Sequence, residues 1–311
     1  MTKRTLYTLA LLLVAGLALA ACGSSKKTSS TSTAASSGPG KGKPAVTLGT
    51  KNFPEEYILG QLYKQALEAK GYTVNLKNSI GSTEVIDTAL TSGKIDMYPE
   101  YTGTIVQEVE KSNALPTSAS ATYAQAKAFE EKRGFTLLAQ TPYANSDALG
   151  TKPAYAQQHG LTSISDLKKV GAFSFGAPPE SKTRYQGLVG LQKLYGLNGI
   201  TFVPLTIGLQ YQALDSGKIQ VADVFTTDGQ LLSGKYKVLT DDKHLYGFQN
   251  AVPVVKKSLV SSEGPAFTQT MNSVSALLTL PAIQKMNAAV VLDKQDPAAV
   301  ASQFLQANHL K

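Results

Sequence analysis

The chain has 311 residues, of which 42% are hydrophobic and 17% are charged, so it is globular and long enough for about two core-bearing lobes. A single cysteine excludes a disulfide framework and a cysteine-based metal cluster. No two of the three histidines are spaced to share a metal: His159, His244 and His309. The sequence therefore predicts neither a zinc hydrolase nor a dithiol redox enzyme, and no metal or cofactor is expected.

The formal net charge of +8 is concentrated at the N-terminus. Residues 1–44 contain no acid, and removing their six positive charges leaves +2 for residues 45–311. The basic character therefore does not belong to a folded surface that must neutralise phosphates, and nucleic-acid binding is not expected. The six basic residues are Lys3, Arg4, Lys26, Lys27, Lys41 and Lys43.

The first 21 residues are typical of a secretory leader. Two basic residues precede an apolar run over residues 9–21, which is too short to span a bilayer as a stable helix. The run ends in Leu-Ala-Ala-Cys-Gly, which resembles the lipobox of bacterial lipoproteins. The resemblance implies cleavage before Cys22, lipidation of that cysteine, and anchoring at the extracytoplasmic face of the bacterial cell membrane. An ordinary signal peptide with a chance cysteine is the alternative.

Residues 22–44 are rich in Ser, Thr, Ala and Gly and show no apolar periodicity. Such a segment cannot bury enough surface to offset its ordering entropy. It is predicted to be a flexible tether, with the folded part beginning near Ala45.

From residue 46 onward, short apolar runs alternate with segments of helical periodicity. Strands are expected at 46–49, 72–76 and 95–98, a helix from a cap at Asn52 to a stop at Gly71, and a second helix at 82–90. The later elements are a strand at 173–176, a helix at 185–195, a strand at 251–255, and helices at 265–280, 282–291 and 297–305. This alternation predicts α/β architecture with largely parallel sheets, whose ligand edge lies at the carboxyl ends of the strands.

One phrase of the sequence occurs twice, 124 residues apart. Residues 89–95 and 213–219 share six of seven identities, and the same offset pairs Tyr101 with Phe225. A coincidence between two common helix–turn–strand phrases remains open. The second interpretation is that two equivalent lobes each carry an aromatic residue just after a strand. The cleft between such lobes is a common place for a small-ligand site.

The final helices are expected to return to the first lobe, so that the chain crosses between lobes twice. Lobe 1 is predicted to comprise residues 45–148 and 252–311, and lobe 2 residues 149–251. The hinge is expected near 148–151 and 249–253.

Several stretches resemble the osmoprotectant (glycine betaine, carnitine, choline) substrate-binding proteins of ABC importers. They include VTLGTKNF at 46–53, YPEYTGT at 98–104, FTTDG at 225–229, DDK at 241–243 and NAVP at 250–253. The resemblance implies a bilobed, periplasmic-binding-protein-like (type II) fold that closes on a quaternary ammonium solute. It also implies a monomer that is not an enzyme and has an ABC permease and ATPase as partners.

The family's binding positions can be placed on this sequence. A lysine and an arginine that hold the ligand carboxylate fall on Lys51 and Arg184. The first cage tyrosine falls on Tyr101, with the hydroxyl of Thr104 nearby. The remaining cage positions hold other residue types here: Asp147, Phe225 and Gln249.

These departures change the expected ligand. Phe225 keeps an aromatic face for a cation, Asp147 adds a carboxylate, and Gln249 offers hydrogen bonds that a trimethylammonium group cannot use. Betaine itself is therefore put in doubt, and a solute with an N–H or hydroxyl group, such as choline or an amino-acid derivative, fits better. If the placement is shifted by a few residues, the cage members are Tyr143, Tyr246 or Phe248.

Structural roles are the alternative for each candidate. Lys51 could be a solvated surface lysine, and Arg184 could form a surface ion pair with Glu180 or another acid. The two aromatic residues could belong to the core, and Asp147 could cap a turn.

Two other functions compete with solute capture. A hydrolase or transferase would use Asp96, Glu100 or Lys51, but the sequence has no phosphate loop and no G-x-S-x-G elbow. An adhesion or sensor protein could use the same fold without transport.

Overall fold

The computed structural model describes residues 38–112 and 116–311, which belong to one compact unit of the chain. The predicted leader, the lipidation site Cys22 and most of the predicted tether lie outside the described residues. The end of the tether is described and is not free. The amide of Gly40 donates to Lys70 O over 3.0 Å, and any side chain at Gly38 would lie 2.2 Å from the same oxygen. The folded part therefore begins several residues before Ala45.

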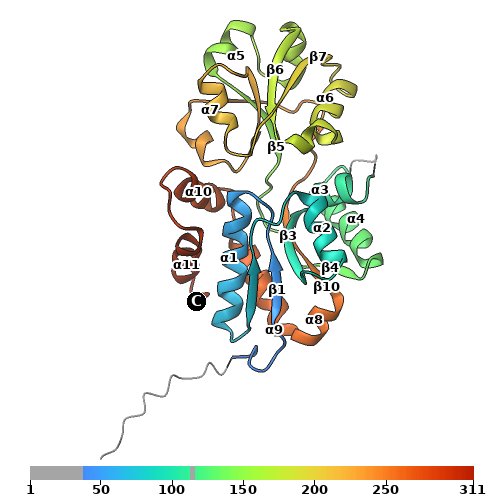
Figure 1. The fold of residues 1–311 in the computed structure, drawn as a ribbon, viewed down its shortest axis with the longest axis vertical. Coiled ribbons are helices and arrows are strands. Elements are labelled where there is room, and N and C mark those ends of the chain that lie inside the picture. The colour runs from blue at the N-terminus through green and yellow to red at the C-terminus, as the bar shows by residue number, and fades with distance from the viewer. Residues whose placement is uncertain (1–37, 113–115) are drawn as a thin grey trace, which may run out of the picture. The chain divides into compact units, whose positions relative to one another are not determined.

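The first sheet has five strands in the order β2-β1-β3-β10-β4 (Figure 1). β1 is parallel to β2 and β3, whereas β10 is antiparallel to both β3 and β4. These strands are β1 (Val46–Gly49), β2 (Val74–Lys77), β3 (Met97–Tyr101), β4 (Phe135–Leu137) and β10 (Ala251–Lys256).

The second sheet repeats this pattern with the order β7-β6-β8-β5-β9. β6 is parallel to β7 and β8, and β5 is antiparallel to β8 and β9. These strands are β5 (Asp147–Thr151), β6 (Ala172–Ala177), β7 (Gly199–Pro204), β8 (Val221–Phe225) and β9 (Lys237–Leu239).

Helices cover the sheets and bury separate apolar cores in the two lobes. Around the first sheet lie α1 (Pro54–Ala69), α2 (Thr83–Thr91), α3 (Thr102–Thr104), α4 (Ala119–Lys132), α8 (Lys257–Glu263), α9 (Pro265–Leu277), α10 (Leu280–Val291) and α11 (Pro297–Ala307). Around the second lie α5 (Pro153–His159), α6 (Gly190–Lys193) and α7 (Gln210–Asp215). The α/β prediction is confirmed, but the prediction of largely parallel sheets is wrong. The sheets are mixed, because β10 and β5 are each antiparallel to both of their neighbours. The C-terminal helices α9, α10 and α11 pack on α1.

Two predicted helices differ from the structure. The first begins at Pro54 with Phe53 as its N-cap residue, so the predicted cap at Asn52 is wrong by one position. The helix predicted over 185–195 is a π-helical segment, Tyr185–Val189, followed by the short α6. Gly187 breaks it with φ −130° and ψ −135°, because its Cα packs so closely on Ser181 that a Cβ would lie 2.1 Å from Ser181 O.

The internal repeat is structural. The two copies of the repeated phrase connect α2 to β3 and α7 to β8, and the two strands are offset by the predicted 124 residues. β3 and β8 also hold the same central place in their sheets. Tyr101 and Phe225 are therefore the last residues of equivalent strands.

The chain crosses between the sheets twice, after β4 and after β9, and the two crossing segments pair with each other. Ala144 and Asn250 form an antiparallel bridge, and the amide of Asn145 donates to Gln249 O over 2.9 Å. β5 joins the second sheet from Asp147 and β10 joins the first from Ala251, while the lobe limits at 148/149 and 251/252 stay predictions.

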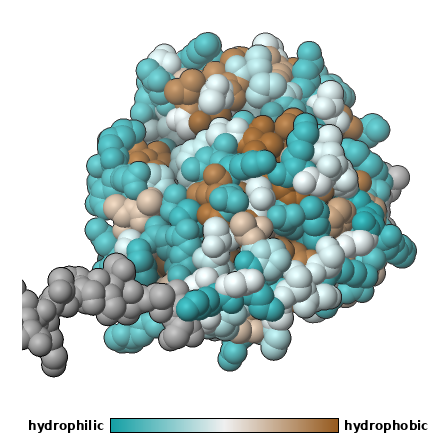
Figure 2. Space-filling view, turned by 60° about the horizontal axis from the view of Figure 1, so that its bottom comes forward, coloured by the Kyte–Doolittle hydropathy of each residue, from teal (hydrophilic) through white to brown (hydrophobic). Residues whose placement is uncertain are grey.

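In the part of the chain that the structure describes, no single helix is long and apolar enough to cross a membrane. Helices α9 and α10 meet the length and composition requirements only as a pair, and they are bent by 87° at their junction. The face shown in Figure 2 is mainly hydrophilic, with small separate hydrophobic patches.

Candidate functional site

A cavity that is partly open to solvent lies between the lobes. Its empty space is about 540 Å³ when the adjoining open solvent is included. It is lined by the last residues of β3 and β8, by the segments that follow β1, β2, β6 and β7, and by the start of β5 with the crossing segment before it. Most of the lining therefore lies where parallel strands end, as expected for an α/β sheet. Six of the seven predicted ligand-binding residues line it. They are Lys51, Tyr101, Thr104, Asp147, Arg184 and Phe225.

Three aromatic rings from both lobes form a row along this cavity. The ring of Phe53 is stacked between the other two, with centroids 6.4 Å from Tyr101 and 6.1 Å from Phe225. Sequence reasoning placed Tyr101 and Phe225 here and missed Phe53. Its position between a strand end and Pro54, two residues after Lys51, is the signal that could have identified it.

The side chain of Lys51 is buried and already paired. Its Nζ forms an ion pair with Glu100, and Glu100 also accepts a hydrogen bond from Thr83 Oγ1 over 3.0 Å. The same Nζ lies 4.4 Å from the ring centroid of Tyr101 and 5.5 Å from that of Phe53. The chain's own ammonium group thus contacts the aromatic row. The alternative of a solvated surface lysine does not fit this burial.

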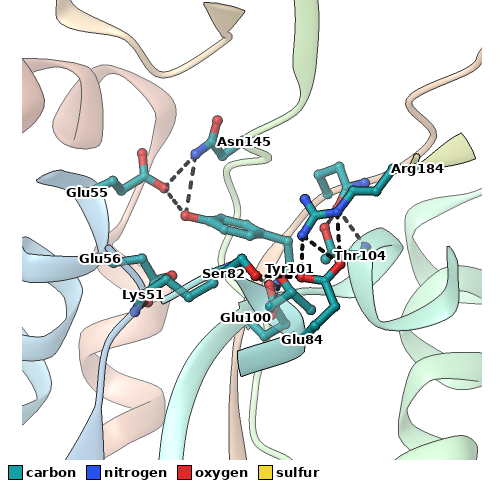
Figure 3. A network of polar contacts seen from close by, with 12 residues as sticks. Lys51, Glu55, Glu56, Ser82, Glu84, Glu100, Tyr101, Thr104, Asn145 and Arg184 are labelled. Carbon is teal, nitrogen blue, oxygen red and sulfur yellow. Dashed lines mark hydrogen bonds and ion pairs between the residues drawn. The ribbon is translucent and has the colours of Figure 1, made fainter. Parts of the chain in front are cut away.

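A buried carboxylate on α1 holds the rim of the cavity in place (Figure 3). Glu55 Oε1 accepts hydrogen bonds from Tyr101 Oη over 2.8 Å, Tyr143 Oη over 3.0 Å and Asn145 Nδ2 over 3.0 Å. Its second oxygen accepts from Asn287 Nδ2 over 2.8 Å. The network fixes the orientation of the Tyr101 ring and joins the first crossing segment to α1 and α10.

Glu56, the next residue of α1, is fully buried and accepts one hydrogen bond, from the amide of Lys51 over 3.1 Å. Its Oε1 has no hydrogen-bond partner among the described residues. Burial raises the pKa of Glu56 from its ordinary value to about 8, although the charge of Lys51 opposes the rise. Burial therefore favours the protonated form of Glu56.

Arg184 reaches from the second lobe to the first. Its guanidinium contacts both carboxylate oxygens of Glu84 over 2.9–3.1 Å and lies 4.0 Å from Glu108 (Figure 3). Partial burial would raise the pKa of Glu84, but hydrogen bonds from Arg184 and Ser82 lower it to about 2. The partner of Arg184 is thus an acid of the other lobe and not Glu180.

On the second lobe, the wall of the cavity is set by the pairing of β5 with β8. Asp147 stands directly opposite Phe225, and Asp223 lies two pairs farther along, opposite Leu149. Burial raises the pKa of both carboxyl groups above the ordinary range, and for Asp223 the neighbouring Asp147 raises it further. Asp147 therefore lines the cavity as predicted, with a second carboxyl group behind it.

Gln249 is the predicted residue that does not line the cavity. Its Oε1 accepts from the amide and the hydroxyl of Thr104 over 3.0 and 3.2 Å, and its Nε2 donates to Tyr246 O over 3.1 Å. It packs over Gly103, where a Cβ would lie 2.6 Å from Nε2. Gln249 therefore links the second crossing segment to α3 by hydrogen bonds. This geometry does not favour a contact between Gln249 and a ligand.

The alternative cage members do not line the cavity either. Tyr143 and Tyr246 are buried in the fold, whereas Phe248 is 37% exposed outside the cavity. Residues that sequence reasoning missed contribute instead: besides Phe53, they include Asn145 and Ser181.

The comparisons with known proteins agree with this geometry. Residues 44–307 match the family model described as the substrate binding domain of an ABC-type glycine betaine transport system. A glycine-betaine-binding protein of Pseudomonas aeruginosa is 33% identical over 282 residues, covering 85% of this chain and 88% of the relative. The ergothioneine transport permease/ergothioneine binding protein of Helicobacter pylori is 31% identical over 85% of this chain but only 47% of its own length.

The fold has solved counterparts as well. The crystal structure of a glycine betaine/carnitine/choline ABC transporter is 26% identical, with a TM-score of 0.70 over 85% of this chain and 99% of that one. The fold is the bilobed type II fold of periplasmic binding proteins. The chain therefore belongs to the family of substrate-binding domains of ABC-type glycine betaine transport systems.

Proposed function

We propose that the interlobe cavity captures a small cationic or zwitterionic solute of the quaternary ammonium class. The row formed by Phe53, Tyr101 and Phe225 beside the carboxyl group of Asp147 is the observation that carries this proposal. The face of an aromatic ring attracts a cation by roughly 0.5–2 kcal/mol, and more strongly where water is excluded. Two relatives are named as binding proteins for glycine betaine and for ergothioneine, and these names support the same ligand class.

The solute is held by closure of the two lobes, and the closed form is what an ABC permease with its ATPase would receive. Arg184 and Glu84 already span the cleft, which supports a closing motion about the paired crossing segments. A ligand that contacts both lobes stabilises the closed form by its differential affinity for that form. No bond is made or broken in this role.

We further propose that the protein acts outside the cytoplasm as a monomer, with Cys22 as its lipid anchor. The leader with its lipobox-like end supports this location. Replacing Cys22 by Ala should move the protein from the membrane fraction to the soluble fraction. If Cys22→Ala stays in the membrane fraction after a carbonate wash, the lipid anchor is refuted.

Isothermal titration calorimetry tests the solute class. Choline, glycine betaine, carnitine and ergothioneine are titrated into the purified chain that begins at residue 38, with glutamate as an anionic control. We expect at least one of the four cationic or zwitterionic solutes to bind with a stoichiometry of one and glutamate not to bind. No heat with any of the four would contradict the proposal, and consumption of a bound solute would favour an enzyme.

A further inference from the structure

Two carboxyl groups share one face of the second sheet. Side chains two positions apart on a strand point to the same face, so the β5–β8 register places Asp147, Phe225 and Asp223 together. Asp147 and Asp223 are diagonal neighbours across the two strands. Each carboxyl group is near enough to shift the pKa of the other. Asp147 lines the cavity, and Asp223 lies behind it.

The inner carboxyl group, that of Asp223, has a single long hydrogen bond among the described residues. Asp223 is only 3% exposed, and its Oδ1 has no hydrogen-bond partner among the described residues. Its Oδ2 has one long contact, 3.5 Å, with the hydroxyl of Ser181, which itself lines the cavity. Asp223 is buried and Asp147 is half-buried. Two neighbouring carboxylates in such surroundings repel each other, and one proton held between them relieves that repulsion.

The charged surroundings do not neutralise this pair. Arg184 and Lys51 are near enough to attract its negative charge, but each is committed to another carboxylate, Glu84 and Glu100 respectively. Among the described residues, neither carboxyl of the pair forms an ion pair. The other titratable groups that face it are acids or phenols: Asp228, Tyr211 and Tyr246.

We propose that the Asp147–Asp223 pair is the charge-recognising element of the cavity, which holds one proton when the cavity is empty and releases it when a positively charged solute without a carboxylate binds. This inference rests on the proposed function and deepens it. The proton passes from the carboxyl pair to solvent, and the positive charge of the solute takes its place.

The solute is expected to lack a carboxylate because the cavity has no uncommitted cation to bind one. Within the described lining, the cations are Lys51 and Arg184, and both have carboxylate partners from the chain. Glu180 adds a further acid to the lining. A solute carboxylate would have to displace one of these partners, whereas a plain cation meets an excess of negative charge.

The pair exists on one side of the cleft only. In the equivalent sheet of the first lobe, the residue that corresponds to Asp223 by the 124-residue offset is Pro99, and the residue opposite Tyr101 is Ala251. The carboxyl groups therefore give the cavity a polar wall on the second lobe, across from the buried Lys51–Glu100 pair.

The test is calorimetric titration of choline and glycine betaine between pH 5 and 8, in pairs of buffers with different ionisation enthalpies. Both probes carry the same trimethylammonium group and differ by the carboxylate. We expect choline to bind more tightly than betaine and to release close to one proton. Because binding favours the deprotonated pair, the affinity for choline should rise by up to about tenfold per pH unit and then level off.

Asp223→Asn supplies the decisive variant. An amide at this position can donate to Asp147 in place of the shared proton, so choline should still bind while proton release and the pH slope disappear. Asp215→Asn, which removes one surface carboxylate of the same lobe, should behave as wild type. If Asp223→Asn does not fold, the proton count of the wild-type protein decides alone.

The outcomes separate the two proposals. Choline binding without proton release, or unchanged release in Asp223→Asn, overturns the carboxyl-pair proposal. Betaine binding more tightly than choline also overturns it and leaves the proposed function standing. Binding of no member of the solute panel refutes the proposed function itself.

Discussion

Phe53 is the central ring of the aromatic row, because its ring is stacked on one ring from each lobe. The plane of the Phe53 ring makes an angle of 7° with the Phe225 ring and of 21° with the Tyr101 ring, so the three rings are nearly parallel. The Lys51 ammonium lies over Tyr101 and so already occupies one face of the row. The same ammonium lies 5.5 Å from the ring centroid of Phe53. A solute cation that enters from the cavity therefore depends on the ring surface that the stacking and Lys51 leave open.

Replacing Phe53 by Leu keeps most of the apolar volume and removes the aromatic face. We expect the affinity for the bound solute to fall by about 2- to 30-fold, which corresponds to the loss of one cation–π contact. Calorimetric titration gives the dissociation constant. Phe248→Leu is the matched control, because Phe248 lies outside the cavity and is exposed. Equal affinities of Phe53→Leu and the control would place the cation elsewhere.

At the scale of elements, the contact between the N-terminal turn of α2 and the loop before Tyr185 joins the lobes. Glu84 and Arg184 meet there through a bidentate ion pair. The folded pKa of Glu84 is depressed to about 2, so the pair is complete above the ordinary pKa of a glutamate and is lost as the pH falls through that of the folded state. Since the Glu84 side chain is 44% exposed, the pair contributes less than about 1 kcal/mol to stability.

Glu84→Gln should therefore act on lobe closure more than on folding. We expect the ligand-free variant to have a larger radius of gyration by small-angle scattering, with a thermal midpoint close to that of wild type. The freed guanidinium should also improve glycine betaine binding relative to choline. Asp215→Asn removes an ion pair with Lys152 inside the second lobe and is the control that should leave the radius unchanged. A radius identical in both variants would show that the Arg184 contact does not hold the lobes.

At the scale of the whole molecule, several acids have pKa values raised by burial. Those of Glu56 and Glu130 rise to about 8 and about 7, and that of Asp228 rises to about 6. Between the ordinary pKa of an acid and its raised value, the folded state holds a proton that the unfolded state has lost, so stability falls as the pH rises. We expect a higher thermal midpoint at pH 5.5 than at pH 8.5, measured by calorimetry or circular dichroism.

Glu56 should account for a large part of that slope, because a shift from its ordinary value to about 8 is worth on the order of a few kcal/mol. Glu56→Gln mimics the protonated side chain and should flatten the dependence of unfolding free energy on pH. Glu68→Gln, at an exposed position of the same helix, should retain the wild-type slope. Parallel slopes in all three proteins would show that Glu56 is not the group responsible.

Much of the fold could be predicted because local sequence patterns determine where its strands and helices form. The strand–helix alternation and the repeated phrase at 89–95 and 213–219 indicated two equivalent α/β lobes, and the offset placed Tyr101 and Phe225 at equivalent strand ends. Helix boundaries were less certain. Gly187 shows why: its backbone conformation follows from contact with Ser181, which no local pattern reveals.

The sequence by itself determined the architecture and brought six of the seven candidate residues to one cavity, because hydrophobic periodicity and strand ends are local properties and the family resemblance supplied the rest. Only the tertiary structure decided which charges meet. The pairs Lys51–Glu100 and Arg184–Glu84, and the diagonal placement of Asp147 beside Asp223, bring together residues far apart in the chain. Such partners are set by strand register and by the approach of two lobes, and these depend on the packing of the whole molecule.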